Sequence, residues 1–515
     1  MSQWHQLASD TLPGQIARSY EVKNSKPPAI VQQKRSFASA KIDRLTADWL
    51  TTNNAIDQEL RSDLDRLRMR SRQLGKDNDY ARKFLNMVVR NVVGHSGFMP
   101  QARAADAPNT PDNLARGAVE NHFARWARLG VCDVTGRMSF ADIQRLVMRM
   151  VARDGEALVL ELYGKAAGNK YGYALQVLDV ARLDTTMNLA ATNGRNSIVM
   201  GVEMNSYQRP VAYWLYEKNP GSPEGGGQRI RIEANNVMHF YLPDHAEQSR
   251  GIPWLHTAMI RLHNLRGYEE AAVIAARIGA SKMGFFTSPD GSAADIATDS
   301  QDGEFMTEAT PGEFGVIPAG WSFESFNPDY PHQQYGEFIK AALRGISSGL
   351  DVSYNSLAND LEGVNYSSIR SGVLEERDQW MTLQGWFVEA FLTRVFENWL
   401  EMGLLNGAIT QSIGSALPLA KLDKFLAHRW QGRRWQWVDP MKDIEAARLA
   451  VRSGVSSPQA IAAQTGVDFE DMLADIAAFE KAVADTGVTS ISYAESGATS
   501  QQPVSPLPPD TGANG

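Results

Sequence analysis

The chain has 515 residues, enough for two to four domains, and its composition, 43% hydrophobic and 21% charged, is typical of a soluble protein. Its net charge is −8, whereas sequence-specific DNA-binding proteins usually carry a basic surface. The single cysteine, Cys132, excludes an intrachain disulfide and a cysteine-based zinc site. No apolar run is long enough to cross a membrane, and the first 24 residues lack the apolar core of a signal peptide.

The first 150 residues are predicted to be mainly helical after a polar start. Residues 1–50 show no sustained periodicity, and we expect an arm that is ordered only by contact with something else. Asp79 is expected to cap the second helix, and Ser139, three residues before Asp142, is close to a capping box. The predicted helices span 60–74, 80–93, 111–129 and 139–152.

From Asp154 onwards, short runs rich in Val, Leu and Tyr are separated by Gly, Asn and Pro, a pattern typical of antiparallel strands. The Gly-rich segment 221–227 is expected to be a hairpin tip. No Lys-Ser/Thr follows it, which excludes a phosphate-binding P-loop. The predicted strands cover 157–163, 173–178, 198–204, 211–216 and 237–242.

Two helices are expected to flank a small insertion. Pro253 is suited to the first position of a helix that runs to about residue 280, and helical periodicity returns over 335–350. The segment between them, 284–330, breaks into short strand-like pieces. Small side chains gather at the far end of the first helix and would let a neighbouring helix approach closely: Ala271, Ala272, Ala275, Ala276 and Ala280.

We expect the chain to be organised around residues 335–403, in which a polar loop follows the second helix. Its turn-forming residues, Asn355, Ser356, Asn359, Asp360 and Gly363, favour irregular structure, so two rigid elements would present the loop at a fixed place.

A long apolar helix comes after this loop and is expected to end at a Gly403 cap. A final helical region is predicted over 441–484. From residue 486 on, the chain is rich in Ser, Thr, Pro, Gly and Gln, and we expect it to be disordered.

Gly345, Ser347 and Gly349 match the G-x-S-x-G pattern of a serine hydrolase. That motif needs a strand before it and a helix after it, whereas here a helix precedes and a loop follows. We favour a helix end loosened by two glycines and keep a hydrolase using Ser347 as the alternative function.

Other possible sites also have simpler explanations. Asp351, Asp360 and Glu362 could be paired carboxylates, but nothing sets their separation, and Asp is common in turns. The histidines are not spaced along the sequence as the ligands of a metal ion are. A third group combines tryptophans and arginines, as sites that bind single-stranded nucleic acid do. We favour core packing or a subunit interface for it, because both residue types are also enriched at protein interfaces. The group consists of Arg429, Trp430, Arg433, Arg434, Trp435 and Trp437. We therefore predict no catalytic, cofactor or metal site.

An ordered series of motifs resembles the lambda-like family of tailed-bacteriophage portal proteins, or head–tail connectors, over roughly residues 60–480. Its stretches include Arg-Asp-Gly-Glu at 153–156, Gln-Ser-Arg-Gly-Ile-Pro-Trp at 248–254, Gly-Leu-Asp-Val-Ser-Tyr at 349–354 and Asn-Tyr-Ser-Ser-Ile-Arg at 365–370. No single stretch is diagnostic, but the order and spacing are specific. The resemblance implies an α+β, mainly helical chain without enzymatic activity, assembled as a ring of typically twelve copies.

The resemblance also divides the chain into functional segments. The DNA-facing residues of the tunnel loop would be Asn355, Asn359, Asp360, Glu362 and Asn365. The segments are an arm (1–50), a wing (51–252 and 371–440), two stem helices (253–280 and 335–350), a clip (281–334), a tunnel loop (351–370), a crown (441–485) and a tail (486–515).

The implied partners are those of a capsid vertex: the large terminase subunit, head-completion or adaptor proteins, the major capsid and scaffold proteins, and double-stranded DNA that passes without sequence specificity. No membrane is involved; the ring would assemble in the host cytoplasm and remain in the virion. Other virion structural proteins are the remaining alternative. The copy number in solution and the trimming of the termini are left open.

A simple estimate supports a ring that fits DNA. Twelve helices about 9.5 Å apart define a circle of about 18 Å radius, which leaves a bore of about 26 Å for a duplex of about 20 Å. Each phosphate that Lys or Arg neutralises strengthens sequence-independent DNA binding. A chain with a net charge of −8 per copy should therefore let DNA slide. In this interpretation Asp360 and Glu362 repel DNA.

Overall fold

Four helices build the first part of the chain. They are α2 (Ile56–Asp77), α3 (Asp79–Val92), α4 (Asn113–Trp126) and α5 (Phe140–Asp154), in agreement with the predicted helices. The computed structural model describes residues 53–107, 110–192, 194–280, 284–287, 322–325, 334–362, 366–433, 435, 440–464 and 469–486. The predicted arm at 1–50 and all but the first residue of the predicted tail lie outside these ranges.

The starts of two of these helices follow from local hydrogen bonds. Ser139 Oγ accepts from the Asp142 N–H at 3.2 Å and Asp142 Oδ2 accepts from the Ser139 N–H at 3.1 Å, which confirms the capping box. The prediction that Asp79 caps α3 is wrong, because Asn78 Oδ1 accepts from the Ala81 N–H at 2.9 Å. Asn78 has the extended backbone that a cap requires, and Asp79 is already helical.

Two antiparallel sheets follow. The three-stranded sheet has the order β10-β4-β5, and the four-stranded sheet has the order β6-β7-β8-β9. The predicted strand at 198–204 is instead a hairpin, because Met200 and Gly201 reverse the chain at φ 45° and 84°. The strands are β4 (Glu156–Tyr163), β5 (Tyr173–Leu178), β6 (Ser197–Val199), β7 (Val202–Met204), β8 (Pro210–Tyr216), β9 (Arg229–Glu233) and β10 (Val237–Tyr241).

The remaining strands are short. β1 (Met99–Ala102) pairs with β13 (His428–Gln431), so Pro100 lies opposite Trp430 and segments more than 300 residues apart are joined. The sequence analysis did not predict β9. Because β9 pairs with β8, residues 221–227 lie at the tip of a hairpin, as expected. The two remaining pairs are β2 (Ala105–Ala107) with β3 (Thr110–Pro111), and β11 (Gly284–Thr287) with β12 (Ser322–Ser325).

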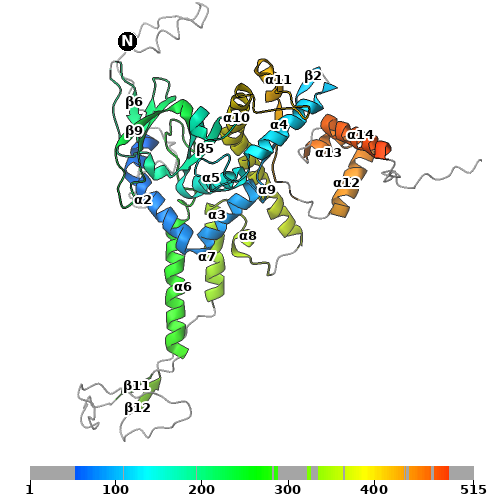
Figure 1. Cartoon of the computed structure of the whole chain (residues 1–515). Coiled ribbons are helices and arrows are strands. Elements are labelled where there is room, and N and C mark those ends of the chain that lie inside the picture. Colours follow the sequence, from blue (N-terminus) through cyan, green and yellow to red (C-terminus); the bar gives the residue numbers. More distant parts are fainter. Residues whose placement is uncertain are drawn as a thin grey trace, which may run out of the picture.

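Two helices project from this body as a stem, with β11 and β12 at their far end (Figure 1). They are α6 (Met259–Ala280) and α7 (Tyr335–Gly349). The prediction that the first helix begins at Pro253 is wrong: residues 254–258 form turns, and the helix starts at Met259. The Trp254 N–H donates to the Ala152 carbonyl at 3.1 Å, so this segment is tied to the end of α5 before the stem begins.

The chain then returns to the body. The long apolar helix is α9 (Tyr366–Phe387), a π-helical turn η5 (Val388–Leu392) and α10 (Thr393–Leu405). The prediction that Gly403 caps this helix is wrong. Gly403 lies inside α10, and a Cβ there would lie 2.8 Å from Ile409 Cδ1.

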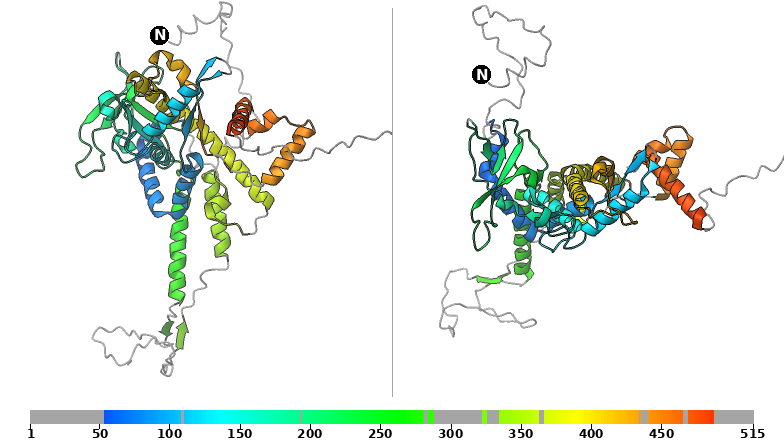
Figure 2. Two further views of the ribbon diagram at one scale, coloured as in Figure 1. Left: turned by 45° about the vertical axis from the view of Figure 1, so that its right-hand side comes forward. Right: turned by 45° about the horizontal axis from the view of Figure 1, so that its top comes forward.

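Three C-terminal helices stand at one side of the body in both views of Figure 2, within the region predicted to be helical. They are α12 (Pro440–Arg452), α13 (Pro458–Gln464) and α14 (Phe469–Thr486). The other short helical elements are η2 (Gly164–Ala167), η3 (Val180–Arg182), η4 (Ala234–Asn236), α8 (Tyr354–Ala358), η6 (Leu419–Lys421) and α11 (Leu422–Leu426). The fold is thus α+β and mainly helical, as predicted.

An aromatic cluster forms the centre of the body. The Phe123 ring lies 5.3 Å from Trp126, 5.5 Å from Phe140 and 5.0 Å from Trp399, between centroids. Trp430 also packs against Phe123 at 6.2 Å, which agrees with core packing for this tryptophan. Trp435 lies partly buried against the same core, and Trp437 lies outside the described residues.

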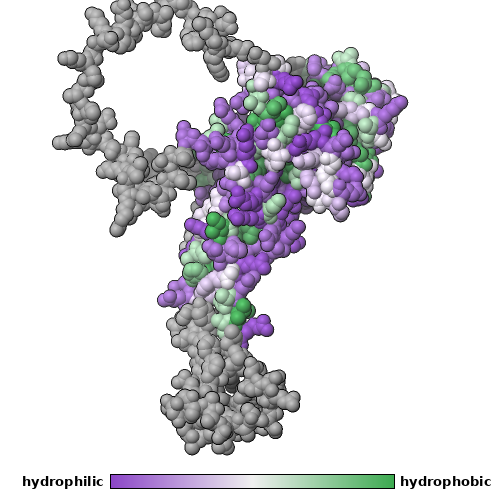
Figure 3. All heavy atoms as spheres, turned by 90° about the vertical axis from the view of Figure 1, so that its left-hand side faces the viewer, coloured by the Kyte–Doolittle hydropathy of each residue, from purple (hydrophilic) through white to green (hydrophobic). Residues whose placement is uncertain are grey.

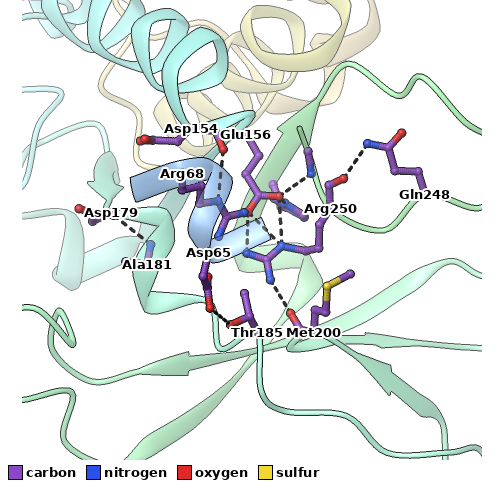
Figure 4. Close-up of polar contacts among 12 residues, drawn as sticks. Asp65, Arg68, Asp154, Glu156, Asp179, Ala181, Thr185, Met200, Gln248 and Arg250 are labelled. Carbon is purple, nitrogen blue, oxygen red and sulfur yellow. Dashed lines mark hydrogen bonds and ion pairs between the residues drawn. The ribbon is translucent and has the colours of Figure 1, made fainter. Parts of the chain in front are cut away.

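A buried ionic cluster joins the helical part, the sheets and the root of the stem (Figure 4). Glu156, at the start of β4, is fully buried and accepts hydrogen bonds from Arg68 of α2 and from Arg250. His239 Nε2 lies 2.9 Å from Glu156 Oε2, and the Gly251 N–H donates to that oxygen at 2.8 Å. One carboxylate therefore binds four groups from distant parts of the chain.

Two glycines allow this crossing. Gly155 has φ 89°, and a Cβ there would lie 2.4 Å from the Ile252 carbonyl carbon. A Cβ on Gly251 would lie 2.1 Å from the Gly155 carbonyl oxygen. The motifs at 153–156 and 248–254 are therefore in direct backbone contact, and side chains at either glycine would separate them.

We expect Phe123→Ala to lower the free energy of unfolding by about 3–5 kcal/mol, because it opens a cavity among five aromatic rings. Chemical denaturation monitored by tryptophan fluorescence measures this loss. Phe338→Ala is the matched control, since Phe338 is 52% exposed. Equal effects of the two substitutions would contradict the assigned core.

We expect Glu156→Gln to cost about 3–5 kcal/mol, because it leaves Arg68 and Arg250 buried without their carboxylate. Asp63→Asn, which breaks the exposed Arg66–Asp63 pair, should cost under about 1 kcal/mol. Similar losses in both variants would argue against a central role for the cluster.

The effect of Glu156→Gln should also depend on pH. Burial would raise the pKa of Glu156, but Arg250 and Arg68 outweigh it and hold that pKa well below the ordinary 4.5. A carboxylate with a depressed pKa contributes stability that is present above the unfolded-state pKa and is lost as the pH falls below it. The stability difference between wild type and Glu156→Gln should therefore shrink when unfolding is measured below about pH 4.5.

Candidate functional site at the stem and its loop

The stem is a pair of helices that are in contact along α7 and the first half of α6. Tyr268 of α6 lies against Tyr335 and Phe338 of α7, with ring centroids 5.8 Å and 4.7 Å apart. Near the body, Thr257 Oγ1 donates to the Gly349 carbonyl. A Cβ on Gly345 would lie 2.1 Å from Arg261 Nη1, so this glycine makes room for the arginine of α6.

These contacts explain the G-x-S-x-G pattern. Ser347 lies in the last turn of α7, 3% exposed, and its Oγ donates to the Arg344 carbonyl at 2.9 Å. A helix precedes the serine, whereas a nucleophile elbow requires a strand. Both glycines lie within α7 and face Arg261 and Thr257, so they serve packing within the stem, whereas the sequence had predicted a helix end loosened by two glycines.

The five stem alanines have different surroundings. Ala272 is buried within the chain, Ala275 and Ala276 are half-buried, and Ala271 is exposed. Ala280 ends α6, but its side chain lies outside the described residues. Ala271 belongs to an exposed face of small and apolar residues at helical spacing, together with Ile260, Gly267 and Ile274. Apolar patches lie among polar side chains on the stem surface in Figure 3.

The loop after α7 contains a short helix, α8, where the sequence predicted only turns. Asn355 lies within α8, and Asn359 follows it in the left-handed conformation at φ 55°. Lys83 Nζ of α3 donates to Asn359 Oδ1 at 2.5 Å, so the loop is attached to the body. Asn365 lies outside the described residues.

The acidic loop residues are paired with the stem. Lys340 Nζ of α7 lies 3.6 Å from Asp360 Oδ2 and 3.2 Å from Glu362 Oε2. The Tyr354 hydroxyl donates to Asp360 Oδ2 at 2.7 Å, and this hydrogen bond lowers the pKa of Asp360. The negative charge expected here is therefore partly compensated by one lysine.

The sequence did not predict the residue that holds the loop to the next helix. Glu376 of α9 accepts hydrogen bonds from Ser353 Oγ at 2.7 Å and Ser356 Oγ at 2.8 Å. Its other oxygen accepts from Trp380 Nε1 at 3.2 Å. The Ser353-x-x-Ser356 pattern signals a helix cap, but no local pattern links it to a glutamate twenty residues away.

A pocket of 360 Å³ lies between the end of α7, the loop and α9. Asp351, Glu375 and Glu376 contribute its charged groups. Among the described residues, no group of three or more His, Cys, Asp and Glu side chains could hold a metal ion, and no helix is long and apolar enough to span a membrane. The pocket is thus an acidic recess beside the loop.

The loop and stem occur in a chain that matches known phage proteins along most of its length. Residues 43–384 match the model of the phage portal protein, lambda family. The probable portal protein of Halomonas phage phiHAP-1 is 33% identical over 473 residues, covering 90% of this chain and 88% of the relative. Portal protein B of Escherichia phage lambda is 20% identical, covering 83% and 85%.

Among solved structures, a chain from the neck of a native GTA particle computed with C12 symmetry aligns with 77% of this chain and 93% of its own length. Its TM-score is 0.40 and its sequence identity is 11%. The family match and the phiHAP-1 relative extend over the stem, the loop and both glycine motifs of the ionic cluster. The chain belongs to the lambda family of phage portal proteins.

Proposed function

We propose that this portal protein forms a ring, typically of twelve copies, that serves as the channel for double-stranded DNA at one capsid vertex. The stem carries the proposal: two closely packed helices, with an exposed face of small and apolar side chains and a loop attached at their root. At 22 residues, α6 would line about 33 Å of channel. Neighbouring stems would pack through Ile260, Gly267, Ala271 and Ile274.

The tunnel loop would face the DNA without holding it. Asn355, Asn359 and Asn365 would offer neutral contacts, and Asp360 and Glu362 would keep the potential from becoming positive beside Lys340. The attachments to Lys83 and Glu376 would keep the loop at a constant position in the channel.

The other partners that we propose are those expected for this family. The clip, 281–334, would dock the terminase motor during packaging and head-completion proteins afterwards. The ring would also nucleate procapsid assembly with the major capsid and scaffold proteins in the host cytoplasm. The wing, 51–252 and 371–440, and the crown, 441–485, would complete the assembled portal.

We expect Gly267→Leu to prevent ring closure, because it places a large side chain where a neighbouring helix would approach. Gly117→Leu in α4 is the matched control, since a Cβ at either glycine meets nothing within 4 Å in the single chain. Glycine is about 0.8–1 kcal/mol less favourable than alanine inside a helix and leucine ranks just below alanine, so neither variant should unfold. Negative-stain images and sedimentation measure assembly; rings from both variants would contradict the stem interface.

We expect the double variant Asp360→Lys, Glu362→Lys to slow or stall DNA packaging. It would place three lysines per copy together, and each added cation strengthens sequence-independent binding to phosphates. The control Glu397→Lys, Glu401→Lys makes the same charge change on exposed positions of α10. Packaging rate and DNA retention measured in an in vitro packaging reaction decide the matter: wild-type values in the loop variant would count against a DNA-facing loop.

A further inference from the structure

A second pocket lies in the body, lined in part by β8, β10 and α10. Its volume is 220 Å³, and its polar lining includes Arg209, Tyr213, His239 and Arg394. The pocket shares no residue with the stem or the tunnel loop described above. It contacts the ionic cluster through His239, whose Nε2 lies 2.9 Å from the Glu156 carboxylate.

Tyr213 supplies a hydrogen-bond donor at this pocket. Tyr213 is only 4% exposed, and its ring packs edge-on against the His239 ring, with the centroids 5.4 Å apart. Burial raises the pKa of Tyr213 to about 12, so the hydroxyl keeps its proton at neutral pH. Within the described part of the chain this hydroxyl has no hydrogen-bond partner. The hydroxyl oxygen is not fully buried, so the pocket leaves it open to a ligand or to water.

Two arginines add further donors. Arg394 uses Nη2 to bind Glu161 and the Asn235 carbonyl, the latter at 2.8 Å. Its Nε and Nη1 groups have no partner among the described residues. The exposed side chain of Arg209 also has none among these residues. The pocket thus collects one O–H donor and the N–H donors of two guanidinium groups, which suit a planar oxyanion.

We propose that this pocket binds one carboxylate group, carried either by an acidic side chain of a second copy of this chain or by a small carboxylic acid in solution. A volume of 220 Å³ accommodates a carboxylate with a short stem and is below the usual range for larger ligands. Arg209 and Arg394 would hold the two oxygens, and the Tyr213 hydroxyl would donate to one of them.

The test uses acetate as the probe and the full chain before assembly. Isothermal titration calorimetry at constant ionic strength should show one saturable acetate site per chain in the wild type. Tyr213→Phe keeps the ring and removes only the hydroxyl, and Arg209→Ala changes an exposed side chain; each should weaken acetate binding about tenfold. Arg195→Ala, another exposed arginine outside the pocket, should leave it unchanged.

Sedimentation then separates the two sources of the carboxylate. If a second copy supplies it, Arg209→Ala and added acetate should both shift the assembly equilibrium towards single chains. If a small acid supplies it, assembly should be the same with and without acetate. The proposal is overturned if acetate shows no saturable binding to the wild type, or if Tyr213→Phe and Arg209→Ala bind it as the wild type does. None of these readouts requires a DNA channel, so they decide this site independently of the proposed function.

Discussion

The structure depends on one buried carboxylate. Glu156 is fully buried, and it is bound by Arg68 from the first described helix, His239 from β10, and Arg250 with Gly251 from the segment that leads into the stem. An unpaired buried charge would be too costly for the fold. These segments therefore have to meet in a single arrangement, and the direction in which the stem leaves the body is set there.

Glycines allow close contact between segments at the ionic cluster and along the stem. Gly155 and Gly251 let two backbone segments cross, and Gly345 lets α7 lie against Arg261 of α6. In each case the absence of a Cβ allows a close contact that a larger residue would block. The loop at the root of the stem is then held from both sides, by Lys83 of α3 and by Glu376 of α9. In the proposed function, these two attachments keep the loop at a constant position beside the DNA.

The body shows how distant parts of the sequence form one core. Strand β13 pairs with β1, and Trp430 joins the rings of Phe123 and Phe396. From the sequence alone, the tryptophans near residue 430 were compatible with single-strand nucleic-acid binding, but core packing or a subunit interface was the favoured prediction. Pairing between strands more than 300 residues apart decided the matter for Trp430, and no local pattern carries that information.

Patterns along the chain were enough to predict the features that depend on near neighbours: the four early helices, the capping box at Ser139, most of the strands, the two stem helices and the family. Periodicity, caps and ordered motifs are local signals, and they suffice for these features. Only the tertiary structure decided where the stem helix begins, that Glu156 is the centre of an ionic cluster, that Glu376 and Lys83 hold the loop, and that Tyr213 meets Arg394 in a pocket. These depend on contacts between residues far apart in the chain, and side-chain identity alone does not specify which charged or polar groups will be buried together.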